Sequence, residues 1–352
     1  MLDFDRSPWL KIEEDLSLFR YAQHSLAQTG SQVPILMLHG PMTSHRTWDT
    51  LATYLSVNGF DHIYAVDIDD SNSALQKESL HFLDAVIGWL VEHHPSEQHF
   101  VLIGHSTGGV LARRYLHRGV YSSKIIYLFS LASPHQQTHF SHIVYVPPEE
   151  TASTMSYVRT PDIPQKTLLI NIFGSKLYAG FDGTIRGVYL PEAVNYPVAL
   201  GHSEIKYNGG VMAEILACLR GERYRLQLYL DSLFMKTTDL DGRAGPFYFE
   251  VEGMRSPFDG VFQAVVDHYY HFDENNTPLF TLAYPVTQTS CTLVFRLKDR
   301  SRVRPVRRRL FVKILVALED QKTVFHEMQD SEGSKITLRI CCQRMPALVE
   351  AL

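Results

Sequence analysis

The spacing of apolar residues changes near Gly221, and this change limits the possible folds more than any other feature of the sequence. Before Gly221, short apolar runs alternate with stretches of helical spacing, which is typical of a parallel α/β sheet. After it, apolar and polar residues alternate with a period of two, as in the half-buried strands of an antiparallel sandwich. We therefore predict a mostly parallel α/β domain over residues 1–221 and an antiparallel β-sandwich domain over residues 222–352.

The same periodicities place individual elements. In the first domain the expected strands are 34–38, 62–66, 99–103, 125–131 and 167–173, and the expected helices are 48–55, 80–90, 110–116 and 211–219. In the second domain the strands with a period of two are 224–230, 247–251, 291–297 and 336–342. Residues 133–165 break the alternation, and a long insertion of this kind in a compact domain is typically functional. Two interpretations stay open for it: a lid with an apolar underside, or a loop that covers the sheet edge.

Charge and histidine content divide the chain at the same boundary. The formal charge of the whole chain is -5, so it lacks the basic excess of a nucleic-acid-binding protein. Residues from 222 onward hold 18 Lys and Arg against 17 Asp and Glu, whereas 14 of the 17 histidines lie before residue 222. We expect no nucleic-acid partner and two domains of different character.

The second domain concentrates its basic residues in one run. The run ends with Arg302, Arg304, Arg307, Arg308 and Arg309. One interpretation is a strand face that contacts an anionic membrane surface. The other is a solvated hairpin tip.

Cysteine spacing and the N-terminus bear on cofactors and location. The four cysteines show neither metal-binding spacing nor a disulfide framework. The first residues lack the basic start and apolar core of a secretory signal, and no apolar run approaches the ~18 residues that span a bilayer. We expect no metal, no organic cofactor and a cytoplasmic location, with export by a signal-less route as the alternative.

The clearest chemical signal is the segment Gly104-His105-Ser106-Thr107-Gly108. An apolar strand precedes it and a helical run follows it, which is the context that a nucleophile elbow requires. Glycines at 104 and 108 leave room for the backbone to reverse, and the turn places Ser106 at a helix N-terminus that favours negative charge. The alternative is a surface serine in a glycine-rich loop.

A base and an acid for Ser106 follow largely by elimination. In the fold that carries this elbow, the acid and then the histidine follow the serine along the chain. The histidines between Ser106 and the boundary are His117, His135, His139, His142 and His202. His202 is the candidate base, because it alone lies late in the domain and after the plausible acids.

The acids between Ser106 and His202 are Glu149, Glu150, Asp162, Asp182 and Glu192. Only Asp182 lies in a glycine-rich loop soon after an expected strand. It would fix the tautomer of His202 and stabilise the imidazolium. A plain Asp182-Gly183 turn is the alternative.

Several segments together resemble a known family. His39-Gly40 after a strand, Trp48, the elbow, Ser133-Pro134-His135, Asp182-Gly183 and Gly201-His202 are similar to the α/β-hydrolase lipases and esterases. The resemblance covers about residues 33–220 and leaves the last third unmatched. It implies an α/β-hydrolase fold with Ser106 as nucleophile, Asp182 as acid and His202 as base. The Ser-Pro-His segment is similar to one of the lipase branch and favours lipid esters.

One position departs from the family pattern. The resemblance implies two backbone donors for the oxyanion, one after the serine and one after His39-Gly40. Thr107 meets the first requirement, whereas Pro41 has no N–H. Either Met42 supplies the donor through a shifted loop, or the oxyanion hole is weakened.

We therefore expect a serine hydrolase that cleaves carboxylic esters, with an acyl ester or lipid as substrate, through an acyl-enzyme on Ser106. Two alternatives stay open. One is an acyltransferase with the same triad. The other is a non-catalytic protein of this fold whose β-sandwich binds a membrane or a protein partner.

Overall fold

The structure is a computed structural model in which two compact units are distinguished. It describes residues 8–22, 33–68, 77–135, 167–174, 182–183, 189–190, 192–234, 236, 247–252, 254–256, 269–272, 278–299, 308–330 and 333–348. The first unit comprises Met1–Val188, Asn195–Arg220 and Leu348–Leu352, and the second comprises Tyr189–Val194 and Gly221–Ala347. Each unit is described by itself.

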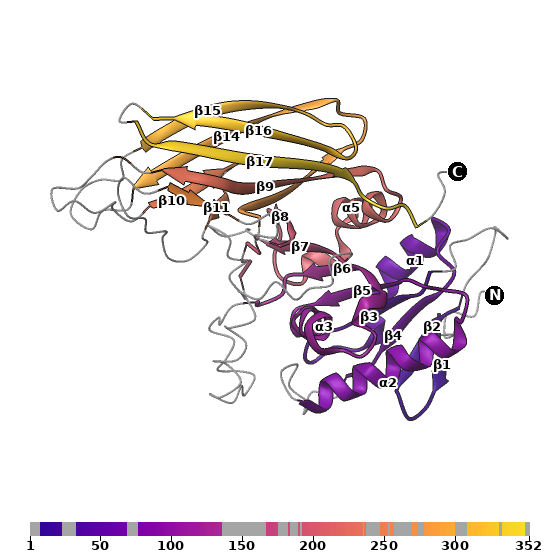
Figure 1. The fold of residues 1–352 in the computed structure, drawn as a ribbon. Coiled ribbons are helices and arrows are strands. Elements are labelled where there is room, and N and C mark those ends of the chain that lie inside the picture. Colours follow the sequence, from indigo (N-terminus) through magenta and orange to yellow (C-terminus); the bar gives the residue numbers. More distant parts are fainter. Residues whose placement is uncertain are drawn as a thin grey trace. The chain divides into compact units, whose positions relative to one another are not determined.

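An eight-stranded sheet forms the centre of the first unit (Figure 1). Its strands are β1 (Trp9–Glu13), β2 (Leu18–Tyr21), β3 (Ile35–Leu38), β4 (Ile63–Val66), β5 (Phe100–His105), β6 (Ile125–Leu131), β7 (Leu168–Gly174) and β8 (Val194–Val198). Their order in the sheet is β1-β2-β4-β3-β5-β6-β7-β8. The pairs from β4 through β7 are parallel, and β1 and β2 add an antiparallel edge. The predicted fold class of this unit, mostly parallel α/β, is confirmed.

The parallel strands are hydrophobic on both faces. Every residue of β3, β4, β5 and β7 is buried. Strands buried on two faces read as continuous apolar runs, and this is why the sequence predicts them. The strands β1, β2 and β8 were not predicted, because each is only partly buried.

Helices cover both faces of this sheet. The chain passes from β3 to β4 through α1 (Asp49–Val57), and it returns from β4 to β5 through α2 (Lys77–His93) in the opposite direction. Because such crossovers are right-handed, α1 and α2 lie on opposite faces. The helix α3 (Thr107–Arg118) packs beside α2, and α5 (Gly209–Leu219) packs beside α1. This winding leaves the carboxyl ends of the parallel strands free for loops.

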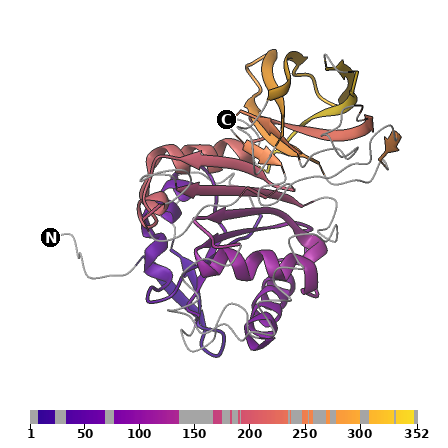
Figure 2. The same ribbon diagram turned by 90° about the vertical axis from the view of Figure 1, so that its left-hand side faces the viewer.

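The second unit consists of two antiparallel sheets, coloured from salmon through orange to yellow in Figure 2. One sheet has the order β11-β10-β14-β15, and the other has β12-β9-β17-β16 with β13 paired to β9. The strands are β9 (Arg223–Phe234), β10 (Phe247–Val251), β11 (Met254–Ser256), β12 (Tyr269–His271), β13 (Phe280–Pro285), β14 (Ser290–Asp299), β15 (Arg308–Ala317), β16 (Lys322–Gln329) and β17 (Lys335–Arg344).

Alternate residues of these strands share one core. Leu226 and Leu228 of β9 are fully buried, as are Phe249 of β10 and Phe295 of β14, whose rings lie 5.4 Å apart. The period of two therefore separates core from solvent. The predicted β-rich C-terminal fold is confirmed.

Two basic residues at the start of the arginine run have a carboxylate partner. Arg296 and Lys298 both bind the carboxylate of Glu250 on the neighbouring strand β10. Arg302, Arg304 and Arg307 lie outside the described residues, and so do the side chains of Arg308 and Arg309. Contact of this run with a membrane surface stays a prediction.

Two further observations concern predictions about membranes and the lid. Among the described residues, no helix is long and apolar enough to cross a membrane. The proposed lid, residues 133–165, lies outside the described residues from 136 onward.

Candidate active site

Ser106 occupies a sharp turn between β5 and α3. Its backbone has φ of 55° and ψ of −124°, a conformation that residues other than glycine rarely adopt. The amide of Ser106 donates to the carbonyl of Leu131 on β6 over 2.9 Å, which holds the turn against the sheet. Strain of this kind persists where the surrounding structure imposes it, and it is concentrated at functional sites.

Two glycines allow this turn by close backbone approach. A Cβ atom at Gly104 would lie 2.5 Å from the Cα atom of Gly109. A Cβ atom at Gly108 would lie 2.3 Å from the carbonyl oxygen of Leu38 at the end of β3. No larger residue fits either position without movement of backbone, which is the reason the motif needs glycine at both.

Thr107 is the first residue of α3. The first amides of a helix have no carbonyl partner within the helix, and the helix dipole adds positive potential there. An oxyanion formed on an acyl group at Ser106 would therefore meet the N-terminus of α3.

The side chains of Asp182 and His202 are joined by a hydrogen bond. Among the described residues, this is the only side-chain hydrogen bond between members of the predicted triad. The Nδ1 atom of His202 lies 2.9 Å from Oδ2 of Asp182. The Asp182 side chain is 1% exposed and that of His202 is 12% exposed. Since Nδ1 donates to the carboxylate, Nε2 is the nitrogen left to accept a proton.

Gly174 at the end of β7 determines where this acid lies. A Cβ atom at Gly174 would come within 2.4 Å of both the Cβ atom of Asp182 and the carbonyl oxygen of Leu200. The end of β7 therefore brings together the segment that carries the acid and the segment that leads to His202. Sequence reasoning missed this residue, because the glycine that ends a strand gave no sign of its distant neighbours.

His105 connects the elbow to the candidate base. Its Nε2–H donates to the carbonyl oxygen of His202 over 3.1 Å, and the two rings lie 4.8 Å apart. Burial lowers the pKa of His105 well below its usual value, and the charges of Lys206 and His202 add to this effect. His105 is therefore neutral. Its hydrogen bond holds the backbone of His202 next to His105, which directly precedes Ser106.

In the described part of the chain, no hydrogen bond joins the Ser106 hydroxyl to the ring of His202. Such bonds are often long before a substrate is in place. The structure thus places His202 against His105, the residue before Ser106. Direct contact between Ser106 and His202 stays a prediction.

The loop after β3 lies against Ser106. A Cβ atom at Gly40 would be 2.9 Å from the Cβ atom of Ser106. Pro41 follows and supplies no N–H. Met42 has a left-handed φ of 57°, and the residue is 79% exposed. The loop therefore reverses at Met42, directly after the position where the family pattern expects a donor.

Asp67 holds this loop from the end of β4. Its Oδ1 atom accepts a hydrogen bond from the His45 amide over 2.6 Å, and its Oδ2 atom lies 2.9 Å from Nδ1 of His45. The ring of His45 stacks on Phe19 of β2, with centroids 3.8 Å apart. The far end of the loop is therefore fixed to two strands.

The near end of the loop is held by His39. The Ile68 amide donates to Nε2 of His39 over 2.9 Å, so the ring carries its proton on Nδ1 and donates to the carbonyl of Gly40 over 2.7 Å. The hydroxyl of Thr43 donates to the same carbonyl over 2.8 Å. The orientation of the peptide bond before Pro41 is thereby fixed.

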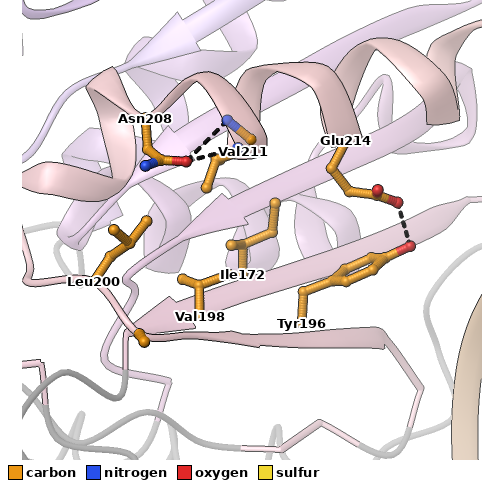
Figure 3. Close-up of a pocket in the computed structure, with 9 residues that line it drawn as sticks. Ile172, Tyr196, Val198, Leu200, Asn208, Val211 and Glu214 are labelled. Carbon is orange, nitrogen blue, oxygen red and sulfur yellow. Dashed lines mark hydrogen bonds between the residues drawn. The ribbon is translucent and has the colours of Figure 1, made fainter.

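A pocket of about 360 Å³ lies between β8 and α5 (Figure 3). Its walls include the apolar side chains of Ile172, Val198, Leu200 and Val211. At one end the Tyr196 hydroxyl donates to Glu214. Neither Ser106 nor His202 lines it. The pocket is therefore separate from the two side chains that the sequence predicts as nucleophile and base.

The described residues contain no group of three or more His, Cys, Asp or Glu side chains that could hold a metal ion.

A mostly parallel sheet with a strained serine at the β5–α3 turn is the arrangement of the α/β-hydrolase fold. Comparison with family models agrees: residues 29–145 match the PGAP1-like alpha/beta domain. The matched stretch contains β3 to β6 and the elbow. The first unit therefore has the α/β-hydrolase fold.

Solved structures with a similar fold include hydrolases. Lipase BlEst2 of Bacillus licheniformis in its mature form is 15% identical over 55% of this chain and 93% of that chain, with a TM-score of 0.44. The propeptide form of the same lipase is 12% identical over 90% of this chain and 97% of that chain, also at 0.44. Esterase Pf2001 of Pyrococcus furiosus is 16% identical over 56% of this chain and 84% of that chain, with a TM-score of 0.42.

A search of curated proteins gives no match. The assignment of the fold rests on the family model and the sheet topology.

Proposed function

We propose that the first unit is a serine hydrolase that cleaves carboxylic esters with Ser106 as nucleophile, His202 as base and Asp182 as acid. The observation that carries this proposal is the bond between His202 Nδ1 and Asp182 Oδ2 at 2.9 Å, on a histidine that packs against the residue preceding a strained serine. This arrangement leaves Nε2 of His202 to take the Ser106 proton.

The reaction proceeds in two halves. Ser106 Oγ attacks the ester carbonyl carbon while its proton passes to His202 Nε2, and the carbonyl oxygen becomes an oxyanion. Collapse of this intermediate breaks the bond to the alkoxide, which takes the proton from His202, and the acyl group stays on Ser106. Water then attacks the acyl-enzyme by the same route and releases the carboxylic acid.

The amide of Thr107 is the proposed first donor to the oxyanion, because it opens α3 directly after Ser106. Met42 is the proposed source of the second donor. Its left-handed φ of 57° supports this, since the loop reverses one residue after Pro41. Loss of one donor typically costs about 100- to 1000-fold in turnover.

An acyl ester of lipid type is the proposed substrate, supported by the sequence resemblance of the Ser133-Pro134-His135 segment to the lipase branch. Hydrolysis is preferred to acyl transfer, although the same acyl-enzyme serves both. An assay that follows both the free acid and the ester of an added alcohol separates the two outcomes.

The experiment that tests the proposal compares wild type with Ser106→Ala on p-nitrophenyl esters from acetate to laurate. Ser122→Ala, in the short helix η2 (Ser122–Lys124), is the matched control. We expect turnover in wild type and the control, and its loss in Ser106→Ala with an unchanged circular dichroism spectrum. Equal turnover by all three proteins would rule the proposal out.

A further inference from the structure

Lys206 is a buried cation between two segments of the proposed active site. It lies in the short helix η4 (Glu204–Tyr207), which follows His202, and is only 4% exposed. Its Nζ atom donates to Oγ1 of Thr47 over 2.7 Å. Thr47 belongs to η1 (His45–Trp48), at the end of the loop whose Gly40 touches Ser106. The ammonium therefore joins the segment of His202, which contacts His105, to the loop of Gly40, which lies against Ser106.

This ammonium has no carboxylate partner in the part of the chain that the structure describes. Besides Thr47, it lies 5.3 Å from the centroid of the Tyr207 ring. An ammonium has three N–H donors, of which Thr47 takes one. Burial of such a group without a counter-charge is costly, and one hydroxyl with one ring face offsets only part of that cost.

The neighbouring carboxylates are committed to other partners. Asp182 binds His202, Asp67 binds His45, and Glu204 accepts the amide of Gly201 over 2.8 Å. None of them forms an ion pair with Lys206. The positive charge is thus uncompensated within these segments.

The charge of Lys206 reaches the proposed catalytic groups. After burial, it is the strongest influence that lowers the pKa of His105. His105 directly precedes Ser106, and its ring lies 4.8 Å from that of His202. A negative group on a substrate bound at Ser106 would therefore lie in the field of Lys206.

We propose that Lys206 is the subsite for an anionic group of the substrate, so that the preferred ester carries a carboxylate or a phosphate in addition to the scissile bond. This inference rests on the proposed function of Ser106. It makes Lys206 a residue that determines specificity, with the uncompensated ammonium as the group that selects charge.

The kinetic test uses two esters that differ only in charge: p-nitrophenyl hemisuccinate and its neutral methyl ester. Wild type should prefer the anionic ester in kcat/KM by at least about tenfold. Lys206→Met should abolish this preference while its rate on the neutral ester changes less, and Lys206→Arg should retain it. Equal preference in wild type and Lys206→Met would overturn the proposal.

Lys124→Met is the matched control for loss of a positive charge. Lys124 ends η2 just before β6, at the amino end of the parallel strands, whereas Ser106 follows the carboxyl end of β5. This variant should keep the charge preference of wild type. A loss equal to that in Lys206→Met would show a general effect of net charge and would contradict a local subsite.

A binding test keeps the inference separate from catalysis. Calorimetry on the Ser106→Ala protein uses n-butylphosphonate and pentanoate as probes of the two anion classes, with n-pentanol as the neutral probe. At least one anion should bind, and Lys206→Met in the same background should weaken it at least about tenfold. Absence of binding, or equal binding by both proteins, would reject the subsite.

The two tests distinguish the failures. Anion binding that depends on Lys206, without any Ser106-dependent turnover, would leave the subsite and remove the proposed hydrolase function. Ser106-dependent turnover without a charge preference would leave the proposed hydrolase function and remove the subsite. If Lys206→Met fails to fold, the comparison of anionic and neutral probes on the Lys206→Gln and Lys206→Arg proteins decides in the same way.

Discussion

His202 and Asp182 are joined at both side chain and backbone. The His202 ring lies 2.9 Å from the Asp182 carboxylate, and the His202 amide donates to the Asp182 carbonyl over 3.1 Å. The backbone bond does not depend on the carboxylate. The side-chain bond can therefore be altered while the loop is retained, which allows its chemical role to be measured.

Asp182→Asn should lower kcat by about 10³- to 10⁴-fold at neutral pH. The amide no longer stabilises the imidazolium and permits the wrong tautomer of His202. The melting temperature should change little, because the backbone bond remains. Ester turnover and a thermal melt check both statements, and a loss of less than tenfold would contradict the role of Asp182.

Gly108→Ala should destabilise the first unit. The added methyl group would lie 2.3 Å from the Leu38 carbonyl, so backbone must move, at a cost of about 3 kcal/mol in the free energy of unfolding. Gly209→Ala is the control, because a Cβ atom there meets nothing within 4 Å. Urea unfolding should show the loss for Gly108→Ala alone; equal stability of the two variants would contradict the packing at the elbow.

Asp67→Asn should loosen the loop that carries Pro41 and Met42. The amide keeps one acceptor for the two His45 donors, so the proposed second oxyanion donor loses its support. We expect kcat to fall by up to about 100-fold with KM little changed.

Glu14→Gln serves as the control for this loss of charge, because Glu14 lies on the surface and forms an ion pair with Lys11. A rise in KM without a change in kcat for Asp67→Asn would assign the loop to substrate binding and not to the oxyanion.

Histidines that are neutral in the fold should make stability fall in acid. Burial lowers the pKa of His94 to about 4, with further contributions from His62, Arg20 and His93. The unfolded chain takes up this proton near the ordinary histidine pKa of about 6.5, whereas the folded chain does not. The stabilisation is complete above that pH and decreases as the pH falls towards 4.

Urea unfolding at pH 7 and pH 5 measures this effect. His94→Gln should show a smaller decrease between the two values than wild type, because one neutral histidine is removed. A decrease of the same size in both proteins would assign the acid sensitivity to other groups.

The sequence predicts those parts of the fold in which burial follows a simple period. The strands β3 to β7 appear as apolar runs because both faces are covered, and β9, β10, β14 and β17 appear through alternation. The strand β15 was missed because its first residues, Arg308 and Arg309, continue the basic run. The strand β16 was missed because its polar residues dominate and only Met328 is buried.

The site divides in a similar way. Local spacing is enough to predict the elbow at Ser106, and order along the chain suggests Asp182 and His202 as its partners. The contacts of Asp67 with His45 and of Lys206 with Thr47 join segments 22 and 159 residues apart. No local period encodes such contacts, so these residues required the structure.

The most direct test of the central claim is covalent labelling of Ser106. Wild-type protein treated with a fluorophosphonate should gain one phosphonyl group by intact mass, and peptide mapping should place it on Ser106. The Ser106→Ala protein should gain none while it keeps its fold. Equal labelling of the two proteins, or a label on another residue, would contradict the account.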